Sequence, residues 1–306
     1  MKNILTLIAV SFIWTSNYGQ QIDLKLNLEK GKEYKQITNS KSKITQEIEG
    51  QVINIEMILR GNMSYLVTAV HEDDYEMEVR YKSLMMSMQL PQGNIEFNSE
   101  KNDEQDVFSM ILAEMKNIPF QITMTKRGKV TDVKNVDTLF ESAFKKFPQL
   151  PKDQMEQIKA QLMKAYGKKA FKGSIEMVTA IYPDSSVKQG ESWKINTKLE
   201  AGFSSDMTSN YQFSANKSDH YFIVGFSTIK TTDKDAYIKS NGIAMKYNMT
   251  GNMSSEIKID KISGWIIEAK INQEIEGDVY FKENSEMPNG MKVPMSMKND
   301  MTFSNQ

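Results

Sequence analysis

Apolar and polar residues alternate with a period of two along most of the chain, and this pattern restricts the fold most. In the run from Tyr75 to Lys82, apolar residues at odd positions alternate with charged residues at even positions. Successive side chains of a strand point to opposite faces, so each such run predicts a strand with one buried face. Alternation also favours antiparallel pairing, because buried parallel strands read as unbroken apolar runs. We therefore expect a mainly β (α+β) fold built on curved antiparallel sheet.

The C-terminal alternation is long, from Met291 to Phe303, and Asn299 alone breaks its apolar face. At about 3.3 Å per residue this strand would extend roughly 43 Å, a length that suits a large curved sheet. Pro294 has no N–H to donate to a neighbouring strand. We therefore expect this strand to lie at an edge of the sheet.

The middle of the chain has helical periodicity instead, within residues 104–170. In its clearest helix, Asp153 is the expected N-cap, Glu156 completes a capping box and Gly167 is the expected end. The basic stretch at 164–172 would then fall near a helix C-terminus, where cations are favoured. It does not indicate a nucleic-acid surface, and the whole chain is balanced, with 38 basic and 39 acidic residues.

The sequences on either side of the helical segment share an order of features. Residues 28–34 (LEKGKEY) and 187–193 (VKQGESW) place an apolar residue, a glycine and an aromatic residue at the same spacing. A glycine turn follows in each half, at Gly128 and at Gly264, and leads into a strand pattern. These parallels predict one domain of two related β halves with the helical segment between them. The expected boundaries are 20–306 for the domain, about 21–133 for the first half and about 173–306 for the second.

The N-terminus has the pattern of a signal peptide. A basic start at Lys2 precedes an apolar run from Ile4 to Trp14, and small polar residues follow as far as Gly19. The run is too short to cross a bilayer, which needs about 20 residues. We expect cleavage after residues 1–19 and an exported mature chain with no membrane span. The chain contains no cysteine, so we expect neither disulfides nor a lipid anchor on cysteine.

Motifs for catalysis or metal binding do not stand out. His71 and His220 are the two histidines of the chain, and both lie in predicted turns beside acidic residues. Tyr75 occupies the position where the zinc motif H-E-x-x-H needs its second histidine. No G-x-S-x-G elbow or phosphate-binding glycine loop is present. We expect a non-enzymatic protein without metal or cofactor, although 39 acidic residues leave a glycosidase-type carboxylate pair open.

Methionine is unusually frequent, with 22 residues, many on the apolar side of predicted strands. Three interpretations stay open: ordinary core packing, an adaptable cavity for an apolar ligand, and thioether sites for Cu(I). For the ligand cavity, the best candidate lining residues share one face of a predicted strand. They are Met245, Tyr247, Met249 and Met253.

Two segments carry a resemblance to a known family: residues 120–130 (FQITMTKRGKV) and residues 181–193 (IYPDSSVKQGESW). Their order resembles an uncharacterised family of exported proteins of Gram-negative bacteria, known as a domain of unknown function. The resemblance extends over nearly the whole mature chain and implies a β protein of the periplasm or cell surface. A looser analogy of fold is with periplasmic lipoprotein carriers, in which helices cover a curved half-barrel around an apolar cavity.

Together these patterns predict an exported envelope protein that binds an apolar ligand, such as a lipid, in a methionine-lined cavity. The alternative is a structural or adaptor protein of the envelope that acts through a protein partner. Nucleic acid is not an expected partner, and the sequence leaves the identity of the ligand and the oligomeric state open.

Overall fold

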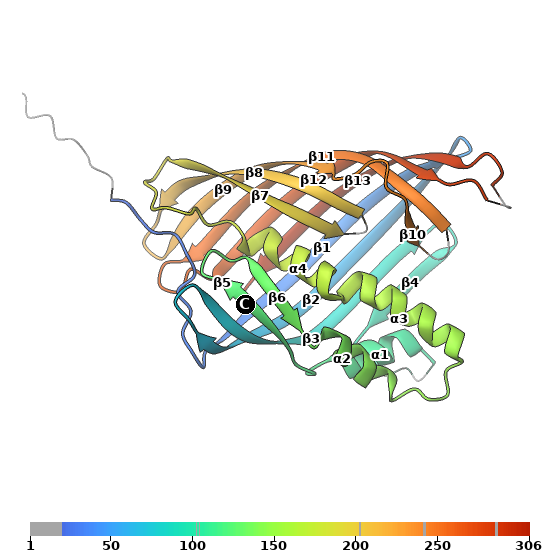
Figure 1. Cartoon of the computed structure of the whole chain (residues 1–306), viewed down its shortest axis with the longest axis horizontal. Coiled ribbons are helices and arrows are strands. Elements are labelled where there is room, and N and C mark those ends of the chain that lie inside the picture. The colour runs from blue at the N-terminus through green and yellow to red at the C-terminus, as the bar shows by residue number, and fades with distance from the viewer. Residues whose placement is uncertain (1–19, 102, 104, 202, 241–242, 285–286) are drawn as a thin grey trace, which may run out of the picture.

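The computed structural model describes residues 20–306 except 102, 104, 202, 241–242 and 285–286. The predicted signal peptide, residues 1–19, lies outside this part of the chain. Antiparallel strands dominate the described residues, and four helices accompany them. The predicted mainly β fold with a curved antiparallel sheet is confirmed (Figure 1).

The first half of the chain is a meander of antiparallel strands with one short helix. Its elements in chain order are β1 (Glu33–Ile48), β2 (Gln51–Val70), β3 (Asp74–Leu90), β4 (Gly93–Asn98), α1 (Val107–Met115), β5 (Phe120–Thr125) and β6 (Val130–Lys134).

Three helices lead from this half to a second meander. The remaining elements are α2 (Val136–Phe144), α3 (Lys152–Tyr166), α4 (Lys168–Thr179), β7 (Ser192–Ala201), β8 (Phe203–Asn216), β9 (His220–Thr231), β10 (Ile238–Ser240), β11 (Ile243–Asp260), β12 (Ile266–Phe281) and β13 (Met291–Ser304).

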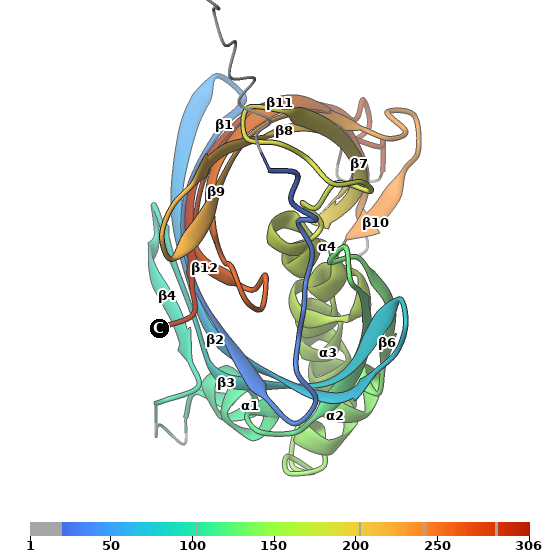
Figure 2. The same ribbon diagram turned by 90° about the vertical axis from the view of Figure 1, so that its left-hand side faces the viewer.

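One sheet contains both meanders because β13 pairs with β1. Its strand order is β6-β5-β3-β2-β1-β13-β12-β11-β9-β8-β7, with β4 added beside β3 and β10 beside β11. The sheet curls around one interior but does not close into a barrel, and β6 and β7 are its edges (Figure 2). Helix α4 lies across the opening between these edges and packs against both of them.

The C-terminal strand has the predicted length, but its predicted place at a sheet edge is wrong. Strand β13 lies in the middle of the sheet, with β1 on one side and β12 on the other. Pro294 pairs with Asp278 of β12 but lies one residue beyond the last β1–β13 pair, which joins Gln46 to Met295. The strand accommodates a proline because the ladder with β1 has already ended there.

The predicted helical segment needs two corrections. The hairpin of β5 and β6 interrupts it, and it extends beyond residue 170 because α4 continues to Thr179. Helix α3 begins at Lys152 after Pro151, so Asp153 lies in its first turn and no side chain caps it. Gly167 ends α3 as predicted, but its extended backbone also starts α4 directly afterwards.

The basic stretch at 164–172 therefore covers both the C-terminus of α3 and the first half of α4. Lys168 and Lys172 lie in the first half of α4, where the helix dipole disfavours cations. Both are paired with acids: Lys168 Nζ lies 3.1 Å from Asp132, and Lys172 Nζ lies 3.9 Å from Glu176. These contacts compensate for the unfavourable position.

The two halves begin in the same way. Gly31 and Gly190 have φ values of 83° and 91°, which favour glycine, and each precedes the first strand of its meander. The N–H of Gly31 donates to Val67 O at 2.8 Å, and that of Gly190 donates to Phe213 O at 2.7 Å. The repeated glycine–aromatic spacing in the sequence therefore corresponds to a repeated turn into the sheet.

An N-terminal strap, residues 22–32, crosses one end of the curled sheet (Figure 2). Leu24, Leu26 and Leu28 of the strap are buried in the core. Its backbone binds both halves: Leu26 N–H donates to Lys126 O at 2.9 Å, and Asn27 N–H donates to Ser263 O at 2.7 Å. The strap thus ties the β5–β6 turn to the β11–β12 turn.

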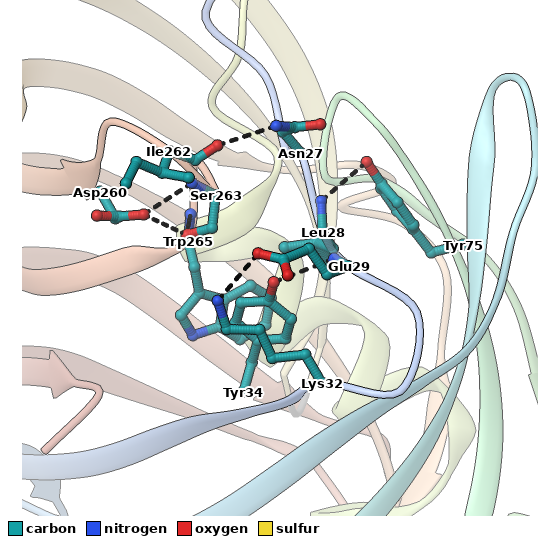
Figure 3. Close-up of polar contacts among 10 residues, drawn as sticks. All are labelled: Asn27, Leu28, Glu29, Lys32, Tyr34, Tyr75, Asp260, Ile262, Ser263 and Trp265. Atoms are coloured by element: carbon teal, nitrogen blue, oxygen red, sulfur yellow. Dashed lines mark hydrogen bonds and ion pairs between the residues drawn. The ribbon is translucent and has the colours of Figure 1, made fainter.

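Beside the strap, Trp265 closes the same end of the interior (Figure 3). Its ring lies 5.3 Å from the ring centroids of both Tyr34 and Tyr65, and its indole N–H donates to Lys35 O at 2.9 Å. Gly264 precedes it with a φ of 67°, and a Cβ there would lie 2.0 Å from Lys25 O. Only glycine allows the strap to approach so closely.

Helix α4 is fixed to both sheet edges by buried hydrogen bonds. Glu176 accepts from Val130 N–H of β6 at 2.7 Å, and Thr179 donates to Gly128 O at 2.7 Å. On the other edge, the Trp193 indole of β7 donates to Ile181 O, just after the helix, at 2.8 Å. The opening between the edges is therefore spanned by a helix that both halves hold.

We predict that Gly264→Ala lowers the free energy of unfolding by about 3 kcal/mol, because it adds a clash with the strap to the cost of a left-handed backbone. Gly31→Ala is the matched control. Gly31 has a similar φ but no atom within 4 Å of an added Cβ, so we expect a loss of about 1 kcal/mol. Urea denaturation of both variants measures the difference. Equal losses would contradict the close approach of the strap.

Stability should also depend on the protonation of Glu176. Burial raises the pKa of its carboxyl, although the Val130 N–H and Lys172 partly oppose the shift. The folded chain therefore holds this proton more tightly than the unfolded chain, and stability falls as pH rises through the raised pKa.

We expect Glu176→Gln, which keeps an oxygen for the Val130 N–H, to remove this fall. Urea denaturation at about pH 4 and about pH 7.5 compares the variant with the natural protein. The variant should gain stability relative to the natural protein at the higher pH. A difference that is the same at both pH values would contradict the assignment.

Candidate ligand-binding face

One face of the sheet looks into the interior, and the strand register identifies its residues. Buried positions alternate with exposed ones along much of β11 and β12, and because paired residues share a face, the register extends this assignment to β1, β2 and β13. The interior side chains are the even residues 34–48 of β1 and the odd residues 53–65 of β2, 245–257 of β11, 269–281 of β12 and 291–303 of β13. We call this surface the concave face.

The concave face is neutral, whereas the outer face is charged. None of the positions just given holds an acidic or basic residue. The outer face of the same strands carries ion pairs, such as Lys298 with Glu274 at 2.8 Å and Lys41 with Glu56 at 3.3 Å. Water therefore wets the outside of the sheet, and the inside is available for apolar contacts.

The concave face is packed at one end and partly open at the other. Near the strap it is filled by buried residues such as Tyr65 and Trp265. Toward the β1–β2 hairpin, the inward methionines of β2, β3 and β13 are half-buried rather than buried. This methionine face consists of Met57, Met86, Met88, Met295 and Met297, whereas half-buried Met301 lies on the strap side of Asn299.

The four predicted lining residues all lie on β11 and point to the concave face, as their spacing indicates. Met249 and Met253 are almost fully buried and belong to the core. Met245 and Tyr247 are half-buried and lie nearer the open end. The structure therefore divides the set into two core residues and two residues that remain accessible from the interior.

Tyr247 is held in place by two contacts. Its ring stacks on Phe203 of β8 with 5.0 Å between centroids, and its hydroxyl donates to the Met245 sulfur at 3.0 Å. Burial raises the pKa of this hydroxyl, so it stays protonated as a donor at neutral pH. The pair forms a fixed wall beside the more flexible methionines.

Sequence reasoning did not select the methionines of β2 and β13 as lining residues. The period-two signal placed each of them on an apolar face. They come near one another only because β1 pairs with β2 on one side and with β13 on the other. Ile44 of β1 pairs with both Ile55 and Met297, which lie about 240 positions apart in the chain. Alternation within one strand does not contain that information.

Polar residues cross the concave face beside the methionines. Ser42, Asn299 and Gln273 are neighbours on β1, β13 and β12, and all three are buried. Asn299 Nδ2 donates to Gln273 Oε1 at 2.6 Å. Asn299 Oδ1 has no partner among the described residues.

The described residues bring no metal-binding cluster together. They contain no group of three or more His, Asp or Glu side chains that could hold a metal ion. His71 and His220 lie in separate turns, 3.7 Å from Glu76 and 2.9 Å from Asp219 respectively. Glu176 is the buried carboxylate in this part of the chain, and it binds the backbone of β6.

A hollow of about 490 Å³ lies on the outer face, near the ends of β12 and β13, and both polar and apolar residues line it. Thr250, Glu276 and Ser296 are among its lining residues. None of the described helices is long and apolar enough to cross a membrane.

A family model matches residues 72–266, which is well over half of the chain. The chain belongs to the family of unknown function DUF6263. The matched region contains the segments at 120–130 and 181–193 that carry the resemblance in the sequence. In the structure, Tyr182 of the second segment donates to Gly264 O, and Trp193 donates to Ile181 O. These family residues therefore hold the α4–β7 connection against the sheet. No curated protein sequence matches the chain.

Among solved structures, the chain is similar to lipovitellin, in a structure concerned with lipid–protein interactions. The TM-score is 0.51 at 8% identity, and the alignment covers 92% of this chain but 25% of the lipovitellin chain. This likeness shows a shared fold, and the chain spans about a quarter of lipovitellin.

An outer membrane channel from Pseudomonas putida F1 and the translocator domain of the autotransporter NalP from Neisseria meningitidis also align. The channel has 7% identity and a TM-score of 0.23, and its alignment covers 91% of this chain and 97% of the channel. The translocator domain has 6% identity and a TM-score of 0.17, and its alignment covers 92% of this chain and 91% of the domain. Scores this low carry no argument about the fold.

Burial predicts different roles for methionines of the same face. We expect Met253→Ala to lower the free energy of unfolding by about 3 kcal/mol, because it leaves a cavity in packed core. Met297→Ala removes a half-buried side chain and should cost about 1 kcal/mol. Urea denaturation of the two variants tests the division. A larger loss for Met297→Ala would show that the methionine face is packed core.

Proposed function

We propose that the protein is an exported, non-enzymatic protein of the bacterial envelope that binds an apolar ligand, such as a lipid, on its methionine face. The observation that carries the proposal is the polarity of the sheet. Its inside is neutral and its outside charged, and the methionines near the open end are left half-exposed inside.

A ligand that covers half-exposed apolar side chains lowers the free energy of the complex, because it removes apolar surface from water. Removing apolar surface from water contributes about 25 cal/mol per Å². Methionine is unbranched and polarizable, so a surface rich in it adapts to flexible ligands of varied shape. An acyl chain lying along β13 against Met295 and Met297 would replace water there without meeting a charge.

The likeness to lipovitellin supports this reading at the level of fold. The lipovitellin structure concerns lipid–protein interactions, and the alignment covers 92% of this chain. Lipid binding by this chain remains our proposal, since the fold alone does not determine function.

The proposed location follows from the sequence. The pattern of residues 1–19 predicts export, and the lack of cysteine fits a protein without disulfides or a lipid anchor on cysteine. A periplasmic or surface location in a Gram-negative bacterium agrees with these features.

The other interpretations of the methionines explain less. Core packing accounts for Met249 and Met253. It accounts only in part for the methionines of β13, because Met295, Met297 and Met301 pack against the core but are not fully buried. A Cu(I) site would place thioethers around one point, whereas the side chains of the methionine face extend along several strands. For an adaptor protein, the exposed apolar residues of the described chain, such as Val52, Phe226 and Ile262, come from separate elements and form no evident common surface.

Binding of the neutral fluorescent probe N-phenyl-1-naphthylamine tests the proposal. We expect the mature protein to bind the probe, and Met297→Glu to weaken binding by at least about 10-fold, because a carboxylate on the methionine face opposes apolar contact. Solvent extraction of the protein purified from its native envelope, followed by mass spectrometry, identifies the natural ligand.

Thr302→Glu is the matched control. Thr302 lies on β13 as Met297 does, but it points to the exposed outer face. The Thr302→Glu substitution adds the same charge as Met297→Glu and should leave probe binding unchanged. Circular dichroism verifies that both variants fold. Absence of probe binding and an empty extract from folded natural protein would overturn the proposal and favour the adaptor alternative.

A further inference from the structure

We propose that the ligand is an uncharged lipid with a hydroxyl group, and that this hydroxyl binds the amide pair Asn299–Gln273 on the concave face. This inference rests on the proposed function and assigns a chemical class to its ligand. The tail of the ligand would lie over the methionine face, and its polar group would enter first.

The amide pair lies deep in the interior rather than at the surface. Asn299 and Gln273 are directly paired residues of β13 and β12, and their side chains are 8% and 5% exposed. Ser42, which pairs with Asn299 from β1, is 4% exposed. These three polar side chains are buried beside the inward methionines of β13, and burial of polar groups costs free energy unless each is hydrogen-bonded.

That requirement is not met within the described chain. The bond from Asn299 Nδ2 to Gln273 Oε1 uses one donor and one acceptor, and Asn299 Oδ1 is left without a partner. Ser255, on β11 beside the same part of β12, also has an unpaired hydroxyl oxygen. A buried polar group left unpaired costs about 1–3 kcal/mol, so two on one face call for a partner from outside the chain.

A hydroxyl is the group that fits this requirement best. It can donate to Asn299 Oδ1, and it can also accept a hydrogen bond. If the oxygen and nitrogen atoms of both amides exchange places, the unpaired group of Asn299 is its NH2 donor, and the same hydroxyl can accept a hydrogen bond from it. A group that is only an acceptor would satisfy one of these arrangements.

The neutrality of the concave face excludes a charged group at this position. No acidic or basic residue occupies the inward positions of the five central strands. A carboxylate or phosphate beside Asn299 would be buried without a counter-ion, which is strongly unfavourable. The site therefore selects an alcohol over a fatty-acid anion or a phospholipid headgroup.

The methionines provide the route to the amide pair. Along β13, Met297 and Met295 follow Asn299 toward the open end, and both are half-buried. Ile44 and Gln46 pair with them from β1. Methionine side chains change rotamer readily, so an acyl chain can pass between them without a shift of the backbone.

Competition against N-phenyl-1-naphthylamine with 1-dodecanol, dodecane and dodecanoate tests the inference. The readout is the affinity for dodecanol divided by that for dodecane, because this ratio isolates the hydroxyl. We expect Asn299→Leu/Gln273→Met to lower the ratio by about 5- to 10-fold without weakening dodecane binding, since one or two hydrogen bonds are lost. The double substitution replaces both partners by apolar groups of similar shape and leaves neither unpaired.

Asn272→Leu is the control, since Asn272 lies on β12 next to Gln273 but points to the outer face. It should leave the ratio unchanged. A ratio that the double substitution does not change would overturn the hydroxyl site while dodecane binding still supports the proposed function. Dodecanoate affinity that falls in parallel with dodecanol affinity would overturn the selection for a neutral group. If none of the three ligands competes and the probe does not bind, the proposed function itself fails.

Discussion

The separation of charge between the two faces of each strand is the constraint on which the rest of the structure depends. Strands 14 to 20 residues long, such as β2 and β13, expose too much apolar surface to remain flat in water. The sheet curls so that its neutral face encloses an interior, and the ion pairs remain outside. The strap, Trp265 and α4 then close the places that curling leaves open, at one end and between the two edges.

This arrangement explains why the interior differs along its length. Aromatic rings and strap leucines fill the end where the two halves are tied together. Toward the hairpin end, the inward side chains of β2, β3 and β13 include half-buried methionines. A core needs side chains of fixed shape, whereas a surface that alternates between empty and occupied states benefits from flexible ones. The buried amides at the junction of the two zones are the point where chemical selectivity can be added.

Local patterns in the sequence predicted the strands and their apolar faces. The repeated turn at Gly31 and Gly190 was visible because one backbone conformation demands glycine at each position. Relations between distant segments were not visible. Pro294 indicated an edge strand by a sound local rule, but the ladder with β1 ends one residue before it. Gly167 indicated the end of a helix but not the helix that starts directly after it.

The candidate site shows the same division. Alternation correctly placed Met245, Tyr247, Met249 and Met253 on one face, but the depth of each depends on strands paired with β11 from elsewhere in the chain. Asn299 was visible as the break in an apolar run. Its meaning required the register that sets it opposite Gln273, and no pattern within a single strand gives a register between two.

The pairing of the first strand with the last has a consequence for folding. Because β1 pairs with β13, the sheet remains in two parts until the final residues are available. Contacts of such large sequence separation are slow to form, and until then β1 and β12 each present an unpaired edge. For the export that we propose, late completion of the sheet would keep the chain unfolded during translocation, and the two open edges would need protection from aggregation until the C-terminal strand is available.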